Sequence, residues 1–500
     1  MIETKSLKLR FEELKNKRSV IEGRWEKYAG YTLPYMFPTD DYINDIEMQG
    51  DYQTVGARAV NSLSNKINTN MFPKHRPFFR IDLTADQTEN LKGMGLGDDD
   101  IMQITSAAER ESIKTLSKQG YGSAALEAVK HLIIFGNALL YDPEGEKAQT
   151  FNLRDYVVVR STNGEWTEII ARDVHTNGTL PEDMQLMATS MGHNDPTEEI
   201  AIYTKISKGN GRVRVTQELE DYGPTGRAGG DYPIEKSPWQ LLTWNLARGQ
   251  NYGTGLVEEY AGAFHQLSTY DMTIQHIAAI AQDIKILVNP MGQTNPQILN
   301  DAESGQYVYG LPDDIAYHSL EKVADLQVIM QQREEVKREI FSAFLVLEGA
   351  VRNAERVTRE EIIRQAQELE ESLGGVYSRL AEEWQGPKAA RLMANLEGEL
   401  AKVDIFVLTG LEALSRTTEH ENLVMTMQDM TVLNEIPEEF RARMKVREVF
   451  TAFAAGRGVD ISKFMMSEDE FDANQEKLAA QNAQQVGSEE QAKNEANQKV

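Results

Sequence analysis

The residues that could carry out chemistry in this sequence are scattered, and their spacing matches no common catalytic pattern. The sequence has no glycine-rich phosphate loop, no H-E-x-x-H zinc motif and no G-x-S-x-G nucleophile motif. The acidic run Gly97–Asp100 could hold a cation, but acids in the first turn of a helix also offset its dipole, and that interpretation is favoured. His265 and His276 share one helical pattern, where histidine is more often packed or exposed than a ligand. The sequence therefore predicts no enzyme and no catalytic, cofactor-binding or metal-binding residues.

The absence of cysteine excludes disulfide bonds, thiolate metal ligands and a cysteine nucleophile, and it indicates folding in a reducing compartment. The N-terminus is charged and lacks the apolar core of a signal peptide. The longest apolar stretch, His131–Tyr141, has only about half of the ~20 residues that a membrane-spanning helix needs. We therefore expect a soluble protein made in the cytoplasm.

The formal charge of −26, from 78 acidic and 52 basic residues, argues against a protein that grips nucleic acid. Such proteins usually carry a basic excess, because lysine and arginine displace the counterions condensed on phosphates. A channel through which DNA must slide is the exception, since strongly basic walls would hold the DNA back. The acidic balance therefore excludes tight DNA binding but not DNA passage.

Hydrophobic periodicity predicts a mainly helical α+β protein with several structural units. Between about residues 138 and 246 the period changes to strand-like alternation. Asn163-Gly164 and Asn210-Gly211 each separate two β-rich runs there, which is a strong hairpin signal. This interval is predicted to form a small β-rich module. Helical patterns precede it at residues 8–33, 52–72, 100–118 and 121–135.

The most regular helical pattern covers residues 254–287 and ends before Asn289-Pro290. Its apolar positions are spaced alternately four and three residues apart, the period of a seam buried against neighbouring helices. At about 1.5 Å per residue, the helix would be roughly 45 Å long. Loops and short strands follow at 288–320, and a second long helix is predicted over 321–346. The predicted seam consists of Leu256, Tyr260, Leu267, Tyr270, Ile274, Ile277 and Ile284.

A third long helix is predicted from a capping box formed by Thr358 and Glu361. Its apolar stripe continues across Gly374 and Gly375, although each glycine in a helix interior costs roughly 0.5–1 kcal/mol relative to alanine. The glycine pair indicates either a bend, which is slightly preferred, or the close approach of another backbone. After Ser467 the chain is polar with almost nothing to bury, which predicts disorder or a lone surface helix.

Four motifs follow one another along the chain: "YTLPYMFP", "DYQTVGARAVNSLSNKINTNMFP", "VTREEI" leading into "ELEESLGGVYSRL", and "TGLEALSR". In these motifs and their order the chain is similar to the portal proteins, or head-to-tail connectors, of short-tailed double-stranded DNA phages. The similarity extends from about residue 8 to about 465. The resemblance implies a ring, usually a dodecamer, at one capsid vertex of the virion, with DNA passing along its axis. In such a ring only neighbouring subunits would cover the apolar seam of the first stem helix. The protein would be made in the host cytoplasm.

The resemblance also implies an order of structural parts along the chain. In this family a wing precedes a stem helix, a clip follows, and a second stem helix leads through a tunnel loop to a long wing helix and a crown. The implied parts are a wing at 1–250, first stem helix at 251–287, clip at 288–320, second stem helix at 321–346, tunnel loop at 347–357, long wing helix at 358–396, crown at 397–470 and polar tail at 471–500.

By the same resemblance, four basic residues and one asparagine of the tunnel loop and second stem helix are candidates to face the DNA. An alternative stays open for the loop, in which Arg356 pairs with Glu355 or Glu360 as an ordinary surface ion pair. The candidates for the DNA tunnel are Arg352, Asn353, Arg356, Arg333 and Lys337.

The clip is implied to dock the packaging motor and later the tail adaptor proteins. Other implied partners are the scaffold and major capsid proteins and further copies of the chain, with no membrane. Aromatic and rigid residues make good interface anchors. The alternative is that the clip tyrosines build its own strands. The candidates for docking are Tyr307, Tyr309, Leu311 and Pro312.

Two other functions remain open at the level of the sequence. One is a ring-forming tail adaptor or helical scaffold protein without DNA passage, although two long helices around a β-containing excursion favour a portal. The other is an enzyme with an unfamiliar acidic site, which activity of a monomer on small substrates would reveal.

Overall fold

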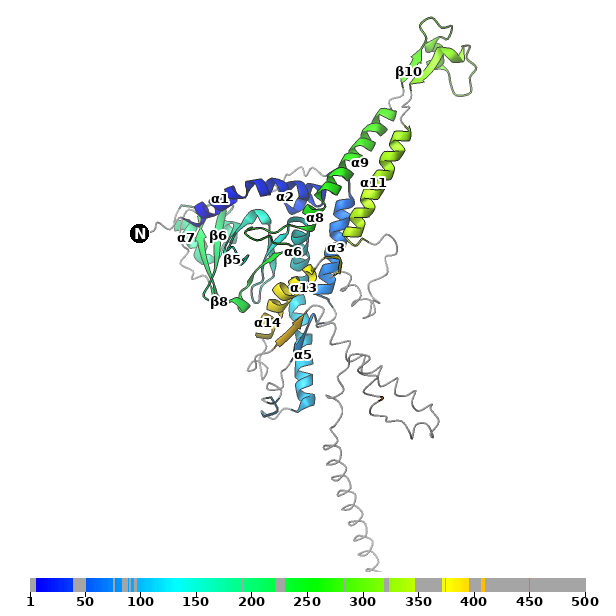
Figure 1. The fold of residues 1–500 in the computed structure, drawn as a ribbon. Helices are drawn as coiled ribbons and strands as arrows, with labels where there is room; N and C mark the ends of the chain where they lie inside the picture. The colour runs from blue at the N-terminus through cyan, green and yellow to red at the C-terminus, as the bar shows by residue number, and fades with distance from the viewer. Residues whose placement is uncertain are drawn as a thin grey trace, which may run out of the picture. The chain divides into compact units, whose positions relative to one another are not determined.

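The computed structural model divides the chain into two compact units, Met1–Leu411 and Glu412–Val500. The residues it describes are 6–38, 51–74, 77–82, 89, 91–93, 97–190, 192–220, 230–282, 285–318, 323–346, 371–373, 375–394, 406–409 and 449. All helices and strands discussed below belong to the first unit (Figure 1).

The chain begins with two helices, α1 (Leu7–Lys17) and α2 (Ser19–Tyr31), where the sequence predicts one. Arg18 separates them and is only 2% exposed. Its guanidinium donates to the carbonyl oxygen of Tyr156 at 2.6 Å and pairs with Glu22 at 2.7 Å. A buried charge is tolerated only when its donors are satisfied, so this clamp fixes the break in the helix and joins it to the β-rich module.

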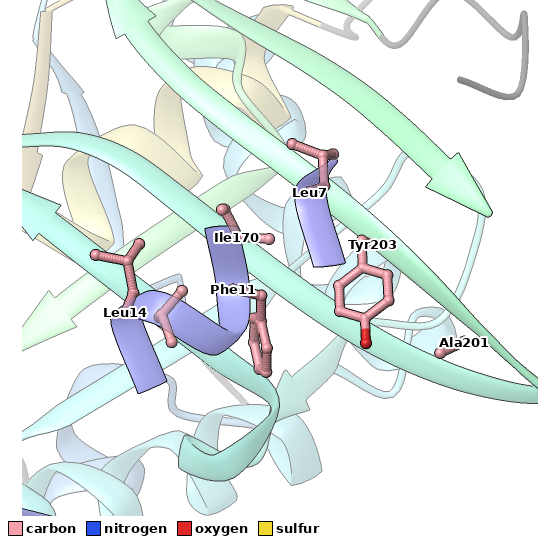
Figure 2. Close-up of a cluster of buried hydrophobic side chains, with 7 residues drawn as sticks. Leu7, Phe11, Leu14, Ile170, Ala201 and Tyr203 are labelled. Carbon is pink, nitrogen blue, oxygen red and sulfur yellow. The ribbon is translucent and has the colours of Figure 1, made fainter. Parts of the chain in front are cut away.

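The larger sheet is antiparallel, with the strand order β4-β5-β6-β7-β8. Helix α1 lies across it, and side chains of β4, β5 and β6 pack against the apolar face of that helix (Figure 2). The strands are β4 (Tyr156–Arg160), β5 (Trp166–Thr176), β6 (Glu199–Gly209), β7 (Arg212–Leu219) and β8 (Asp231–Pro233). The buried cluster is Leu7, Phe11, Leu14, Val157, Ile170, Ala201 and Tyr203.

Both predicted hairpins are confirmed. Strands β6 and β7 meet at Asn210-Gly211, whose φ angles of +50° and +74° are those of a two-residue turn that matches the twist of the strands. Strands β4 and β5 are joined by a longer loop, residues 161–165, in which Gly164 has φ +93°. A side helix, α7 (Glu182–Ser190), follows β5 and packs its buried face on β6 and β7.

A second sheet, of order β3-β2-β9, continues directly from a buried helix. Its strands are β2 (Asn137–Tyr141), β3 (Gln149–Phe151) and β9 (Trp239–Thr243), and they lie within the predicted β-rich interval. The helix before β2 is α6 (Tyr121–Phe135), which contacts α3 and α5. The remaining elements in this part are α3 (Val55–Met71), α5 (Asp98–Lys118), and the short 3₁₀ helices Pro34–Met36, Leu153–Asp155, Asn177–Thr179 and Ile234–Lys236.

The predicted third long helix is not continuous among the described residues. Gly375 has φ +83°, a left-handed conformation that favours glycine, and it precedes the short helix α13 (Val376–Leu380). A π-helical turn, η8 (Ala381–Gln385), and α14 (Gly386–Ala394) follow. The chain therefore leaves helical geometry at Gly375 instead of merely bending there. Gly374 lies outside the described residues.

The segment formed by α13, η8 and α14, called the returning segment below, packs into the core made by the N-terminal helices. Trp384 is fully buried, donates from Nε1 to the hydroxyl of Tyr121 at 2.7 Å, and packs against Phe72. Lys388 pairs with buried Asp142 at 2.7 Å, and burial lowers the pKa of its ammonium group to about 8. Contacts between residues far apart in sequence therefore close this unit.

One further strand, β12 (Phe406–Thr409), pairs antiparallel with β1 (Phe79–Asp82). The first compact unit extends to Leu411, beyond residue 397, at which the crown is predicted to begin. The rest of the predicted crown, apart from residue 449, and the polar tail lie outside the described residues. None of the described helices is long and apolar enough to cross a membrane.

Candidate functional site

The stem begins at a junction where two backbone segments touch. Gly136 has φ +75°, and a Cβ built on it would lie 2.7 Å from the carbonyl carbon of Gly253 and 2.6 Å from the nitrogen of Gly255. The side chain of Asn137 donates to the carbonyl of Gly253 at 3.0 Å and accepts from its N–H at 2.8 Å, as a paired strand would. These contacts fix where the chain leaves β9 and enters the stem.

The first stem helix is shorter than predicted and is interrupted near its start. The structure has α8 (Leu256–Glu259), a break at Tyr260, and then α9 (Ala261–Gln282). Strand geometry begins at Lys285, so the predicted helix over 251–287 ends too late. Ile284, a predicted seam residue, lies outside the described residues.

Helix α9 lies beside α11 (Val323–Ala343), the second stem helix (Figure 1). Phe264 is fully buried and its ring meets Phe344 at 5.6 Å. Leu267 is also fully buried, as is Ile340 on α11. The expectation that only neighbouring subunits could cover the seam is therefore wrong for Leu267, and Leu256 is likewise buried within the chain. Phe264 is not among the predicted seam residues, because it lies one position beside the apolar positions that are spaced alternately four and three apart.

The far half of the seam is less covered. Tyr270, Ile274 and Ile277 are half-buried, as is Tyr260 near the break. On α11, Val328 is 61% and Met330 is 50% exposed. The two stem helices thus bury one end of the apolar pattern within the subunit and leave the other end accessible.

The two predicted tunnel residues on α11 are held in ion pairs within the chain. Arg333 forms a two-pronged pair with Asp271 of α9, and a further bond to Glu334 measures 2.6 Å. The hydrogen bond to Asp271 is the largest cause that raises the pKa of the Arg333 guanidinium. Lys337 pairs with Glu334 at 3.0 Å. Arg333 thus joins α11 to α9, whereas Lys337 is paired within α11, and the prediction that both residues face the DNA stays a prediction. The tunnel candidates Arg352, Asn353 and Arg356 lie outside the described residues.

The clip is built on a short antiparallel pair, β10 (Lys285–Val288) and β11 (Ile315–His318), so its strands begin slightly before the predicted start at 288. Buried Asp314, in the 3₁₀ turn Pro312–Asp314, accepts from the backbone N–H groups of Gln293 and Thr294 at 2.8 and 3.1 Å. The hydroxyl of Thr294 donates to the same carboxylate oxygen at 3.0 Å. These bonds hold the loop that follows β10 against the start of β11. Between them lies α10 (Pro296–Asp301).

The clip presents large apolar side chains to solvent. Tyr307 and Tyr309 are 101% and 100% exposed, and Leu311 is 52% exposed. Neither tyrosine belongs to β10 or β11, so the alternative that they build the clip's strands is wrong. Pro312 is exposed and begins the turn that carries Asp314. Met291, at 94%, adds to this exposed apolar surface.

The described residues contain no group of three or more side chains suited to holding a metal ion. Asp100 accepts from the N–H of Gly97 at 3.1 Å and caps α5, so the helix-start interpretation of the acidic run is confirmed. His265 lies near the hydroxyl of Tyr31, at 3.2 Å from its Nδ1, as a packed surface histidine does.

The carboxyl group of Asp155, near Arg18, predicts that the stability of the folded protein depends on pH. Burial raises the pKa of Asp155 from 3.8 to about 6. The negative charge of Asp173 also raises this pKa, whereas the positive charges of Arg172, Arg18 and Lys15 lower it. Because the folded protein binds this proton more tightly, the stabilisation is complete below pH ~4 and is lost as the pH rises through about 6.

Asp155→Asn, which resembles the protonated acid, is therefore expected to be more stable than the parent at pH 7 by up to about 3 kcal/mol. The advantage should fall to roughly half at pH 5. Denaturant unfolding of both proteins at the two pH values measures it. An advantage that is independent of pH would contradict this assignment.

Comparison with known proteins identifies this chain as a head-to-tail connector of a phage. Residues 4–465 match the family described as bacteriophage head to tail connecting protein, and the chain belongs to that family. It is 32% identical to the portal protein of Escherichia phage T7 over 95% of this chain and 90% of that protein. It is also 32% identical to the portal protein of Enterobacteria phage SP6, over 86% and 84% of the two chains.

Among solved structures, the chain is similar to one described as the virion of a native gene transfer agent particle. The TM-score is 0.39 at 11% identity, over 74% of this chain and 85% of that one. The family assignment rests on the sequence relatives, all named portal proteins.

Proposed function

We propose that identical copies of this chain form a closed ring at one capsid vertex, through which double-stranded DNA is packaged and ejected. The observation that carries the proposal is family membership over residues 4–465. The exposed end of the stem supports it, because an apolar surface repeated on identical subunits can be covered by head-to-tail contacts that close into a ring. Tyr270, Ile274 and Ile277 of one copy would meet Val328 and Met330 of the next.

Within this ring the tunnel loop, residues 347–357, would carry the groups nearest the DNA. Arg352, Asn353 and Arg356 are its candidates, and Arg333 and Lys337 on the second stem helix would reach the DNA by leaving their pairs with Asp271 and Glu334. A few basic groups in an otherwise acidic protein would centre a sliding duplex without trapping it.

The clip would dock the packaging motor and, after packaging, the tail adaptor. Tyr307, Tyr309 and Leu311 are accessible for such contacts, and Pro312 holds the turn beneath them. Scaffold and major capsid proteins would contact other surfaces of the ring. The chain would have no catalytic role of its own, since its sequence has no phosphate loop and ATP hydrolysis would belong to the motor.

Electron microscopy of the purified full-length protein tests the ring. Class averages are expected to show closed rings of about twelve subunits with a central hole wide enough for a DNA duplex, because head-to-tail stem contacts between copies close into a ring. Monomers under conditions that allow assembly would contradict the proposal. If the rings support tail attachment but DNA is still packaged when the protein is removed, a tail adaptor would be favoured.

A further inference from the structure

A cavity of about 530 Å³ lies between the β-rich module and the returning segment. It is lined by the end of β4 and the following hairpin loop, by β9, and by α13 and η8. None of the proposed portal surfaces uses it. Two tryptophans, Trp166 and Trp239, contribute apolar wall beside several polar groups.

Three side chains that line the cavity carry buried polar atoms without hydrogen-bond partners among the described residues. Gln240 is only 7% exposed, and neither its Oε1 nor its Nε2 has a partner. Arg379 has no partner on Nε or Nη2, and Arg160 has none on Nη2. Because an unpaired buried donor destabilises the folded protein, a group that satisfies several of them at once would bind favourably.

The free atoms of Arg379 have a particular geometry. Nε and Nη2 form one edge of the planar guanidinium, which presents two parallel N–H groups to an oxyanion. Arg160 is held in place because it also donates to the carbonyls of Gly164 and Asn251, at 2.8 and 3.1 Å. Arg379 thus offers two parallel N–H donors, and Arg160, which is held in place, offers one further N–H donor.

The charge balance favours a singly charged ligand. Three basic and two acidic side chains line the cavity, a net charge of one positive. Lys208 lies 3.8 Å from Glu165 and is partly neutralised by it. Glu383 remains beside the arginines, where burial raises its pKa and the two guanidinium groups oppose that rise. A doubly charged phosphate would be repelled by this carboxylate more than a monoanion.

We propose that this cavity binds one carboxylate group, held by the Nε–Nη2 edge of Arg379 with Arg160 and Gln240 as additional partners. The group belongs either to a small organic acid or to an acidic side chain of a protein segment. Both sources present the same planar oxyanion, and the tryptophan walls cover the carbon chain behind it.

Tryptophan fluorescence titration of the full-length protein at constant ionic strength tests the proposal. The probes are acetate, the peptide N-acetyl-Gly-Glu-Gly-amide, its Gly-Gln-Gly counterpart and inorganic phosphate. Saturable binding of the glutamate peptide, but not of the glutamine peptide, is expected. If acetate saturates the site as well as the glutamate peptide does, a free small acid is sufficient as the ligand. If only the peptide saturates it, the ligand is an acidic side chain of a protein. No saturation by either carboxylate, or tighter binding of phosphate, would overturn the proposal.

Arg379→Gln is expected to weaken the carboxylate by at least roughly tenfold, the loss of a charge-assisted pair. Arg212→Gln is the matched control, because Arg212 pairs with Asp231 and is not one of the residues that line the cavity, and it should leave the affinity unchanged. Glu383→Gln removes the competing carboxylate and should raise the affinity by about threefold or more. This opposite change keeps the test decisive even if Arg379→Gln fails to fold, and an unchanged or lower affinity in Glu383→Gln would contradict the site.

Discussion

Alanine at position 136 is expected to prevent the protein from accumulating as folded, assembled material. Two costs add at this residue. Its φ of +75° lies in the left-handed region, which costs an L-residue about 1–2 kcal/mol. The new Cβ would also overlap backbone atoms of Gly253, Thr254 and Gly255, which cannot rotate away as a side chain can.

The combined loss is on the order of 3–5 kcal/mol, a large part of the stability of an ordinary domain. Thermal unfolding and the yield of soluble protein measure it. Gly122→Ala is the control on the same helix: nothing lies within 4 Å of a Cβ at that position. It should be neutral or slightly stabilising. A folded Gly136→Ala protein as stable as the control would mean that the Gly136 junction is looser than described.

The second large effect is expected at the clip. The double substitution Tyr307→Ala and Tyr309→Ala should leave ring formation intact, because both side chains are fully exposed and neither lies in a strand. Aromatic anchors at an interface are commonly worth about 2 kcal/mol or more each. Losing two of them should weaken motor or tail docking at least roughly 100-fold.

Complementation of a phage that lacks its portal gene measures this loss as virion titre, with DNA content separating failed packaging from failed tail attachment. Leu186→Ala is the matched control, since this leucine of α7 is 72% exposed but lies outside the clip. Wild-type titres from the tyrosine variant would remove these residues from the docking surface. Loss of rings would instead assign them to subunit contacts.

Local signals in the sequence were sufficient for several elements. Asn210-Gly211 supplies the two positive φ angles that a tight hairpin requires, so the turn and the register of β6 and β7 follow from two residues. The acids after Gly97 likewise cap a helix without help from distant residues. The exposed clip tyrosines were identified as candidates, although the alternative of strand positions was decided only by the structure.

Periodicity was less informative where a distant partner decides burial. It marked one face of α9 as apolar, but it could not say that α11 of the same chain would cover Leu267 while leaving Ile274 half-buried. It also could not place Phe264 in the core. A helical pattern predicts which face of the helix is apolar, but not which element covers that face.

The sequence by itself determined the family, through ordered motifs, and the kinds of local structure, through turn residues, caps and periods. Tertiary structure decided the rest. Arg18 breaks a helix because carbonyl groups from the β-rich module surround it, and Arg333 serves the stem because Asp271 lies opposite. Gly136 requires a missing Cβ because a segment more than a hundred residues away packs against it. Each outcome depends on a partner that is remote in sequence, so no local pattern encodes it.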